Sequence, residues 1–251
     1  MSRPSIQIIG MPGMPEVSTG DDVATMIREA ADSADLKLLD RDVIVIAQKI
    51  VSKAEGRVVQ LDSVEPSARA REWAEAWDKD ARVVEVVFRE SKRIVRMERG
   101  VLISETEHGF VCANAGVDTS NVAADTVTLL PKDPDESAKR IRAVLEKAFG
   151  VSLAVIVSDT FGRPWREGLT NVAIGASGVA PLRSYLGETD PAGRPLTATI
   201  LAIADELAGA AELVMGKLDR IPVAIVRGLR LEPGEEGSKP LIRDPARDLF
   251  R

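Results

Sequence analysis

Residues 151–160, VSLAVIVSDT, set the architecture expected of this chain. Their apolar part, Val151 to Val157, predicts a buried strand, because a short continuous apolar run suits a strand covered on both faces. The run leads directly into Ser158, Asp159 and Thr160. Polar side chains at the end of a buried strand can converge on a ligand. The same stretch therefore predicts both a core strand and a candidate site.

The sequence on either side adds a helix and a charged turn. Upstream, Asp133 and Glu136 form a capping pair around Pro134, and Gly150 follows the apolar pattern, so a helix is expected between them. Downstream, Gly162 permits a tight turn. The arginines of this turn, Arg163 and Arg166, add positive charge beside the carboxylate.

Other segments favour strands and helices without regular alternation. Expected strands are Ile6 to Ile9, Val43 to Ala47 and Val223 to Val226, and expected helices follow Asp22 and Ser67 and begin at Thr197. Short strands broken at Gly100 and Gly109 predict an antiparallel element over Arg93 to Val117. The fold class is α+β, with mixed and antiparallel sheets and flanking helices. We predict one domain, 1–251, with two subdomains: about 1–92 plus 190–251, and an inserted 93–189.

Composition excludes several classes of function. The net charge of -6 opposes attraction to nucleic acid. Thr197 to Met215, the longest helical candidate, carries three acidic residues, so no membrane role is expected. Cys112 is the single cysteine and cannot form an intramolecular disulfide, which favours the cytoplasm.

Two further stretches carry chemically versatile side chains. Lys53 lies in VSKAEG after a buried strand, where a lysine can neutralise phosphate, although taken alone it is read as a solvated surface group. Asp118 lies in CANAGVDTSN beside Ser120 and Asn121, and a simple turn is the competing interpretation. Magnesium and manganese prefer carboxylate and hydroxyl oxygens, so Asp159 with Thr160 suits a metal site, and Asp118 can supply a second carboxylate.

Familiar catalytic motifs are missing from the sequence. It contains no P-loop, so nucleotide binding needs another scaffold. His108 is the single histidine, which excludes a histidine zinc cluster. A thiol nucleophile formed by Cys112 and His108 lacks an orienting third group, so a buried thiol is preferred.

Six ordered blocks carry a resemblance to a known family. They are KIVSKAEGR from Lys49, HGFVCANAGVDTSN from His108, SDTFGRPWREG from Ser158, AIGASGV from Ala173, ADELAGAAELVMGK from Ala204 and IPVAIVRG from Ile221. In this order they resemble the coenzyme F420-0:γ-glutamyl ligase family, from about Gly10 to Gly228.

The resemblance implies a GTP-dependent ligase that attaches L-glutamate to F420-0, releases GDP and phosphate, and makes further γ-glutamyl additions. It implies an α+β homodimer that uses two manganese or magnesium ions and is helped by potassium. The positions that match metal ligands are Asp118, Asp159 and Thr160. The positions that match the GTP site are Gly10, Met11, Pro12, Gly13, Gln48, Lys49, Lys53, Asn121, Met215, Gly216 and Lys217.

Two positions depart from the archaeal pattern. Lys217 stands where those relatives have an acidic metal ligand, so either the second metal is held differently or Lys217 reaches phosphate. Gln48 and Lys49 replace a Ser-Thr pair that contacts nucleotide.

The expected chemistry is activation of the acceptor carboxylate as an acyl phosphate. Lys53 assists electrostatically, and Arg163 and Arg166 are candidates for gripping a substrate oxyanion. The alternatives are a metal-dependent nucleotide phosphohydrolase and a noncatalytic GTP-sensing module. The preferred metal, the number of glutamates added, and F420-0 or its dehydro form as acceptor are left open.

Overall fold

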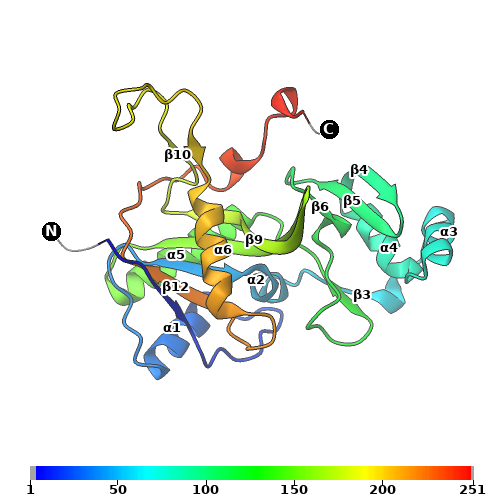
Figure 1. The fold of residues 1–251 in the computed structure, drawn as a ribbon. Coiled ribbons are helices and arrows are strands. Elements are labelled where there is room, and N and C mark those ends of the chain that lie inside the picture. Colours follow the sequence, from blue (N-terminus) through cyan, green and yellow to red (C-terminus); the bar gives the residue numbers. More distant parts are fainter. Residues whose placement is uncertain (1–3, 250–251) are drawn as a thin grey trace.

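The largest sheet is mixed and has five strands in the order β1-β12-β2-β8-β9 (Figure 1). The computed structural model describes residues 4–249. Within this sheet β2 and β8 run parallel, and the other neighbours are antiparallel. The predicted α+β class with mixed and antiparallel sheets is confirmed. The strands are β1 (Gln7–Gly10), β12 (Val223–Arg227), β2 (Val43–Ala47), β8 (Ala154–Arg163) and β9 (Arg166–Ser177).

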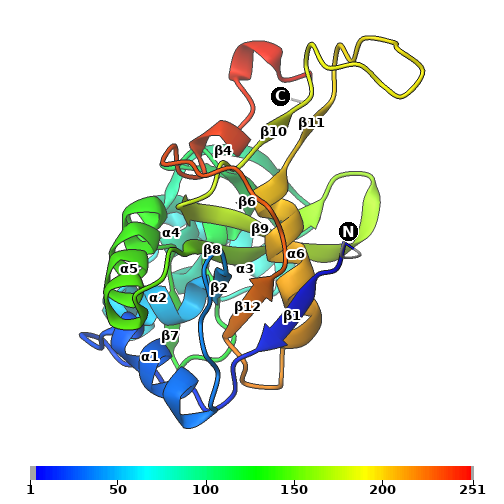
Figure 2. The ribbon, with the colours of Figure 1, turned by 90° about the vertical axis from the view of Figure 1, so that its left-hand side faces the viewer.

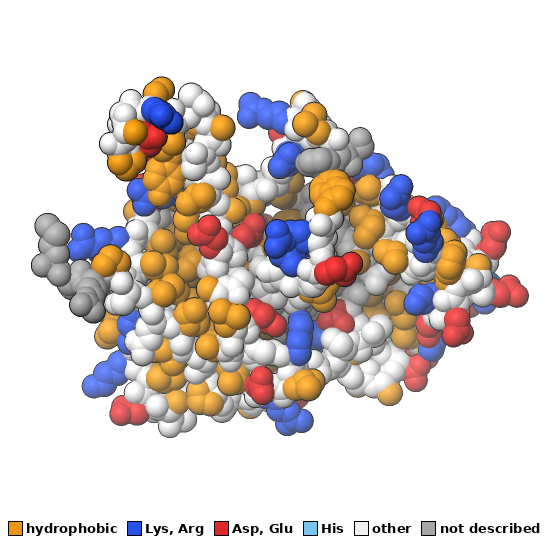
Figure 3. All heavy atoms as spheres, in the orientation of Figure 1, with side chains coloured by type: hydrophobic (Ala, Val, Ile, Leu, Met, Phe, Trp, Pro, Cys, Tyr) orange, Lys and Arg blue, Asp and Glu red, His pale blue; other side chains and the backbone are white. Residues whose placement is uncertain are grey.

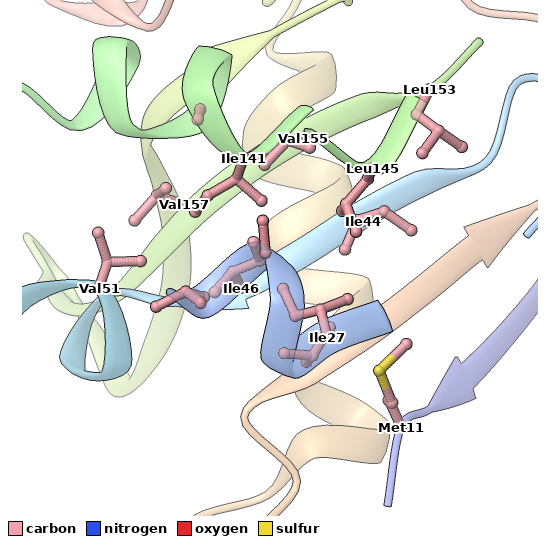
Figure 4. Close-up of a cluster of buried hydrophobic side chains, with 14 of the residues drawn as sticks. Met11, Ile27, Ile44, Ile46, Val51, Ile141, Leu145, Leu153, Val155 and Val157 are labelled. Carbon is pink, nitrogen blue, oxygen red and sulfur yellow. The ribbon is translucent and has the colours of Figure 1, made fainter. Parts of the chain in front are cut away.

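Helices cover both faces of this sheet (Figure 2). Successive side chains of a strand point to opposite faces. Ile44 and Val155 accordingly belong to the core on one face (Figure 4), whereas Val45 and Ile156 belong to the core on the other. Each fully buried Val or Ile contributes about 1.5–3 kcal/mol of hydrophobic stabilisation. The first core includes residues of α1 (Val23–Ser33) and α5 (Pro134–Phe149), and the second includes residues of α6 (Ile203–Met215).

The helix α5 begins and ends as its sequence predicts. Asp133 accepts a hydrogen bond from the backbone N–H of Glu136 at 3.0 Å. Gly150 ends the helix with φ of 68°, a left-handed conformation that glycine adopts without strain. The caps fix the register that buries Leu145 in the first core.

A second, smaller unit is built around an antiparallel three-stranded sheet, as predicted. Its core joins Ala70 and Val87 from two helices to Leu102 from the sheet and Val127 from a two-stranded ribbon. The elements are β4 (Ser91–Glu98), β5 (Val101–Thr106), β6 (Val111–Ala113), α3 (Ala68–Trp77), α4 (Ala81–Arg89), the ribbon β3 (Val58–Gln60) with β7 (Thr126–Thr128), and the short turns η1 (Leu61–Ser63) and η2 (Asn114–Gly116).

The chain departs from the sequence expectations at three places. The helix expected from Thr197 begins at Ile203, because β11 (Ile200–Leu201) first pairs with β10 (Arg183–Ser184). Lys53 was expected near a strand end with a glycine turn just beyond it, and a short helix, α2 (Gln48–Ala54), lies between that strand and the turn at Gly56. The strand expected to end at Val157 continues to Arg163, because β9 pairs with it over that length.

The predicted division into subdomains stays a prediction. The sheets and hydrophobic cores group residues across the expected boundaries. Strands β8 and β9 fall inside the expected insertion 93–189 but belong to the five-stranded sheet. The core of the smaller unit contains residues from both sides of position 93.

The described chain ends with the turns η3 (Lys239–Leu241) and η4 (Pro245–Arg247). Across residues 4–249, no helix combines the length and the apolar composition needed to cross a bilayer.

Candidate functional site

Asp159 and Thr160 lie where β8 outruns its parallel neighbour. Pairing between β2 and β8 stops at Ala47 opposite Ser158, whereas β9 stays paired with β8 as far as Arg163. The expectation that Asp159 and Thr160 follow the strand was wrong, because both are inside it. The end of β2 still leaves this edge of β8 without a strand partner.

Asp118 and Asp159 are brought together, although 41 positions separate them in sequence. Lys49, on α2, places its Nζ 2.7 Å from Oδ2 of Asp118. Ser120 holds the same carboxylate with its backbone N–H at 2.7 Å and its hydroxyl at 3.0 Å. Asp118, in turn, is close enough to Asp159 for its charge to raise the pKa of that carboxyl. The result is a cluster of two carboxylates with a lysine.

The two carboxyl groups differ in pKa. Burial raises the pKa of Asp159 to about 6, and the Asp118 charge adds to the rise, against the lowering effect of Lys217 and Lys49. Burial also acts on Asp118, but hydrogen bonds from Lys49 and Ser120 outweigh it and lower the pKa of that carboxyl. Asp118 is therefore the more readily ionised of the two, and Asp159 gains most from an added positive charge.

Thr160 takes part in a different set of contacts. Its hydroxyl accepts a hydrogen bond from Nζ of Lys217 at 2.6 Å and lies 2.7 Å from Oδ1 of Asn171, to which it donates. The amide nitrogen of Asn171 donates to Oε2 of Glu212 on α6 at 2.8 Å. Because strand residues alternate in direction, Thr160 faces the α6 side of the sheet and Asp159 faces the other side.

The segments predicted to bind nucleotide gather around these two sets of contacts. A side chain at Gly10 would come within 3.2 Å of the Val214 carbonyl oxygen and 3.0 Å of Ile221, so the turn after β1 lies against the loop after α6. Lys53 on α2 pairs with Glu16. Ala47, the residue before α2, donates its backbone N–H to the carbonyl oxygen of Pro222 at 2.8 Å, so the turn 10–13, the start of α2 and the loop 215–221 are neighbours in space.

Several predicted nucleotide positions have only their backbone available to a ligand. The side chains of Met11, Gln48 and Met215 are buried, and Met11 packs in the first core (Figure 4). Gly13 adopts φ of 80° and has no atom near the position of a Cβ, which leaves its backbone open. Further candidates on the surface are Pro12, Asn121, Gly216 and Lys217.

Arg163 and Arg166 are not joined to the carboxylates. The guanidinium of Arg163 donates to the carbonyl oxygens of Gly168 and Glu167, within the β8–β9 hairpin. Arg166 is exposed and faces Arg163 across the hairpin. Four residues along a strand place Arg163 roughly 13 Å from Asp159. Their role in gripping an oxyanion stays a prediction.

The donor set suits a hard cation that brings other ligands with it. Asp159 and Asp118 supply oxygen donors, and a cation bound by them would offset both the burial and the Asp118 charge that raise the pKa of Asp159. Among residues 4–249, no three His, Cys, Asp or Glu side chains gather as a complete metal cage. Magnesium and manganese tolerate this, because water and phosphate oxygens complete their coordination. Asp118 and Asp159 therefore fit the predicted metal site.

Sequence reasoning missed three side chains of the site: Glu16, Asn171 and Glu212. Asn171 is buried within the otherwise apolar end of β9, which is a signal that a partner is needed. Glu212 resembles any other acidic residue on a helix, and Glu16 any exposed one. Their contacts join elements that are distant in sequence, so no spacing rule identifies them.

Cys112 and His108 do not form a nucleophilic pair. Cys112 is buried, and burial, followed by the charge of Asp159, raises the pKa of its thiol to about 12. The His108 ring stacks on Phe110, and its Nε2 lies 2.8 Å from the carbonyl oxygen of Pro131. The interpretation of Cys112 as a buried thiol is confirmed.

Comparisons with known proteins agree with the resemblance. The family model described as F420-0:Gamma-glutamyl ligase matches residues 13–228. The chain is 48% identical over 252 residues to the coenzyme F420:L-glutamate ligase of Methanothermobacter thermautotrophicus, covering 98% of this chain and 99% of that protein. The proteins of the same name from Methanopyrus kandleri and Methanocaldococcus jannaschii are each 47% identical, over 99% and 84% of this chain and 98% and 85% of their own lengths. The chain belongs to the F420-0:gamma-glutamyl ligase family of enzymes.

Proposed function

We propose that this chain joins L-glutamate to coenzyme F420-0 by a GTP- and metal-dependent reaction. The acceptor carboxylate attacks the γ-phosphorus of GTP, which breaks the bond to the β-phosphate oxygen and yields GDP and an acyl phosphate. The amine of glutamate then attacks the acyl carbon, phosphate leaves, and the amine loses a proton as the amide forms. Activation is needed because a carboxylate is a poor electrophile.

The observation that carries the proposal is the meeting of Asp118 and Asp159 beside two lysines. Lys49 contacts Asp118, and Lys217 contacts Thr160, the residue next to Asp159. Two carboxylates suit a metal ion bound to nucleotide, and two ammonium groups suit its phosphates, which supports the proposal. Relatives named for the same ligation are 47% to 48% identical over most of their length.

Each group then has a role in phosphoryl transfer. Asp118 and Asp159 hold manganese or magnesium, which neutralises charge on the phosphate oxygens when bound. Lys49, Lys53 and Lys217 stabilise the negative charge that develops on those oxygens. Lys53 already pairs with the exposed Glu16, so it must leave that pair to reach a phosphate.

The direct test is a mass measurement on the acceptor. The protein is incubated with GTP, L-glutamate, F420-0 and manganese, and the product is examined for the added glutamyl mass. Phosphate release is measured in parallel with and without acceptor. The proposal predicts a glutamyl product and phosphate release that depends on F420-0.

The other outcomes separate the alternatives. Phosphate release that is independent of acceptor identifies a nucleotide phosphohydrolase. Binding of GTP with no phosphate release identifies a GTP-sensing module. Either result, obtained without a glutamyl product, contradicts the proposed ligation.

The proposal includes a homodimer. Hydrophobic side chains gather on the face over α6 (Figure 3), and Leu213 and Leu218 are more than four-fifths exposed. Exposed apolar patches mark association surfaces. Light scattering is expected to give twice the 27.0 kDa chain mass, and Leu213→Glu is expected to reduce it to that of a single chain. The effect of potassium and the cytoplasmic location stay predictions.

A further inference from the structure

A cavity of about 460 Å³ lies between the five-stranded sheet and the smaller unit. Its wall includes Phe110 and His108 from the smaller unit, and Pro134, Lys239 and Ile242 from the main part of the chain. The volume falls within the range of small-molecule sites, roughly 300–1,000 Å³. The cavity is therefore large enough for a sizeable organic ligand.

Two aromatic rings connect this cavity to the carboxylate cluster. Phe110 lines the cavity and meets Phe161 edge to face, with ring centroids 6.2 Å apart. Phe161 is two residues beyond Asp159 on β8, so both side chains face the same side of the sheet. The cavity thus begins on the order of 10 Å from Asp159. One extended ligand can reach both places.

The cavity wall carries two lysines that are not committed to ion pairs. Arg57, which also lines the wall, is paired with Glu90 at 2.7 Å. Lys132 and Lys239 also line the wall. Neither ammonium group has a carboxylate of residues 4–249 within 4.0 Å. Two such lysines at the rim favour an anionic ligand.

Three of the four carboxylates in the same wall, those of Glu90, Asp133 and Asp135, are held by other groups, and the fourth, that of Glu107, is exposed. Asp133 accepts the backbone N–H of Glu136 at the start of α5. Asp135 accepts the backbone N–H groups of Ala176 at 2.8 Å and Ser238 at 2.7 Å. These hydrogen bonds engage the two carboxylates within the fold and leave the lysines to a ligand.

Part of the wall is apolar and aromatic. Phe110 stacks with His108 at an interplanar angle of 17°, and Leu130, Ile174 and Ile242 complete an apolar surface. A flat ring packs well against such a wall. The chemical class that fits is an organic anion with a planar, largely apolar part.

We propose that this cavity binds the part of the acceptor that does not react, while the acceptor carboxylate extends to Asp118 and Asp159. The inference rests on the proposed ligation, which requires an acceptor whose reactive end reaches the carboxylate cluster. An acidic group of the acceptor faces Lys132 and Lys239, and its planar part packs on Phe110. The bound nucleotide stays on the side of α2 and the loop after α6.

The test measures binding of F420-0 and of GTP with manganese separately, by calorimetry on the full chain. The double variant Lys132→Gln/Lys239→Gln is expected to weaken F420-0 binding roughly 5- to 30-fold. Its affinity for GTP with manganese is expected to stay unchanged. The matched control Lys139→Gln/Lys147→Gln removes the same charge from exposed positions of α5 outside the cavity and is expected to bind F420-0 like the unmodified chain.

A second variant, Ile242→Trp, tests the cavity by filling it. It is expected to weaken F420-0 binding and to leave the affinity for GTP unchanged, with thermal unfolding reporting whether the fold is kept. Normal F420-0 affinity in the double-lysine variant and in a folded Ile242→Trp overturns the proposal, and so does a loss confined to GTP. Unmodified chain that binds F420-0 through these residues but forms no glutamyl product supports the cavity assignment and contradicts the proposed ligation.

Discussion

Asp159 and Thr160 are consecutive residues of β8, but their side chains lie on opposite sides of the strand and make different kinds of contact. Asp159 belongs to a cluster of like charges, in which burial and then the charge of Asp118 raise its pKa, while Lys49 contacts Asp118. Thr160 belongs to a relay of hydrogen bonds in which each donor meets one acceptor, from Lys217 through Asn171 to Glu212. The first side has unbalanced charge that a ligand can relieve, and the second is already satisfied. We infer that a metal ion binds on the Asp159 side, whereas the hydrogen bonds on the other side hold Lys217 in position for the phosphates.

Asp159→Asn should have the largest effect, because it removes the charge that the cluster offers to a metal ion. We expect ligation to fall by at least about 100-fold. The amount of glutamyl product formed per unit time measures this. Asp205→Asn is the matched control: burial also raises the pKa of Asp205, but its carboxylate only accepts from the backbone of Ala173 at 2.9 Å. Ligation within about twofold of normal in Asp159→Asn contradicts the assignment.

Thr160→Val should have a smaller effect on turnover and a clear effect on stability. It leaves the buried Asn171 without its hydroxyl partner and Lys217 without its acceptor, which costs about 1–3 kcal/mol of unfolding free energy. We expect ligation to fall about tenfold. Denaturant unfolding and steady-state kinetics measure the two effects, and Thr160→Ser should restore both. A loss of ligation as large as that of Asp159→Asn, with stability unchanged, contradicts the different roles given to the two sides of β8.

The pH dependence of stability should distinguish Asp159 from an ordinary carboxyl group. Its folded pKa of about 6 lies above its unfolded value, so the folded state binds the proton more tightly. The stabilisation is fully present below the unfolded pKa of about 4 and is lost as pH rises through about 6. In metal-free protein, we expect unfolding of the unmodified chain to become easier by about 1–2 kcal/mol over this interval, relative to Asp159→Asn.

Asp118→Asn should change the pH dependence of stability in the opposite direction. The pKa of Asp118 is lowered in the folded state, so its stabilisation is present above the unfolded pKa and is lost as pH falls through the folded value. Denaturant unfolding measured from about pH 3.5 to about pH 7.5 follows the loss for Asp159 and the onset of the loss for Asp118, because this interval includes the unfolded carboxyl pKa and the raised pKa of Asp159. Parallel curves for the unmodified chain and Asp159→Asn over that interval contradict the raised pKa.

Local signals in the sequence were enough to predict the elements that hold the site. The capping residues of α5 and the apolar runs of β2 and β8 act on residues close to them in sequence, so the helix and the two strands can be predicted from the sequence alone. The meeting of Asp118 with Asp159 was a hypothesis from carboxylate chemistry that spacing alone does not predict, and the family resemblance then supported it. Sequence reasoning thus located the cluster because relatives share its motifs.

The relay on the other side of β8 was not predictable in the same way. Whether Asp159 and Thr160 share one site depends on how far β8 extends, and that length is set by pairing with β9. An isolated loop would leave both side chains free to converge, whereas a pleated strand separates them. Glu212 and Asn171 meet only because α6 packs over β9.

Lys49→Met should have the smallest effect of these variants, and it distinguishes the lysine on the Asp159 side of β8 from Lys217 on the other side. Nζ of Lys49 holds Oδ2 of Asp118, so an entering cation must displace it, whereas Lys217 contacts a hydroxyl on the other side of the strand. Because the Asp118 side chain is 39% exposed, solvent weakens this competition. We expect Lys49→Met to tighten manganese binding, without nucleotide, about 2- to 5-fold. Lys217→Met should change it less. Calorimetric titration with manganese measures both, and an equal gain in the two variants would show that both sides of β8 hold the same cation.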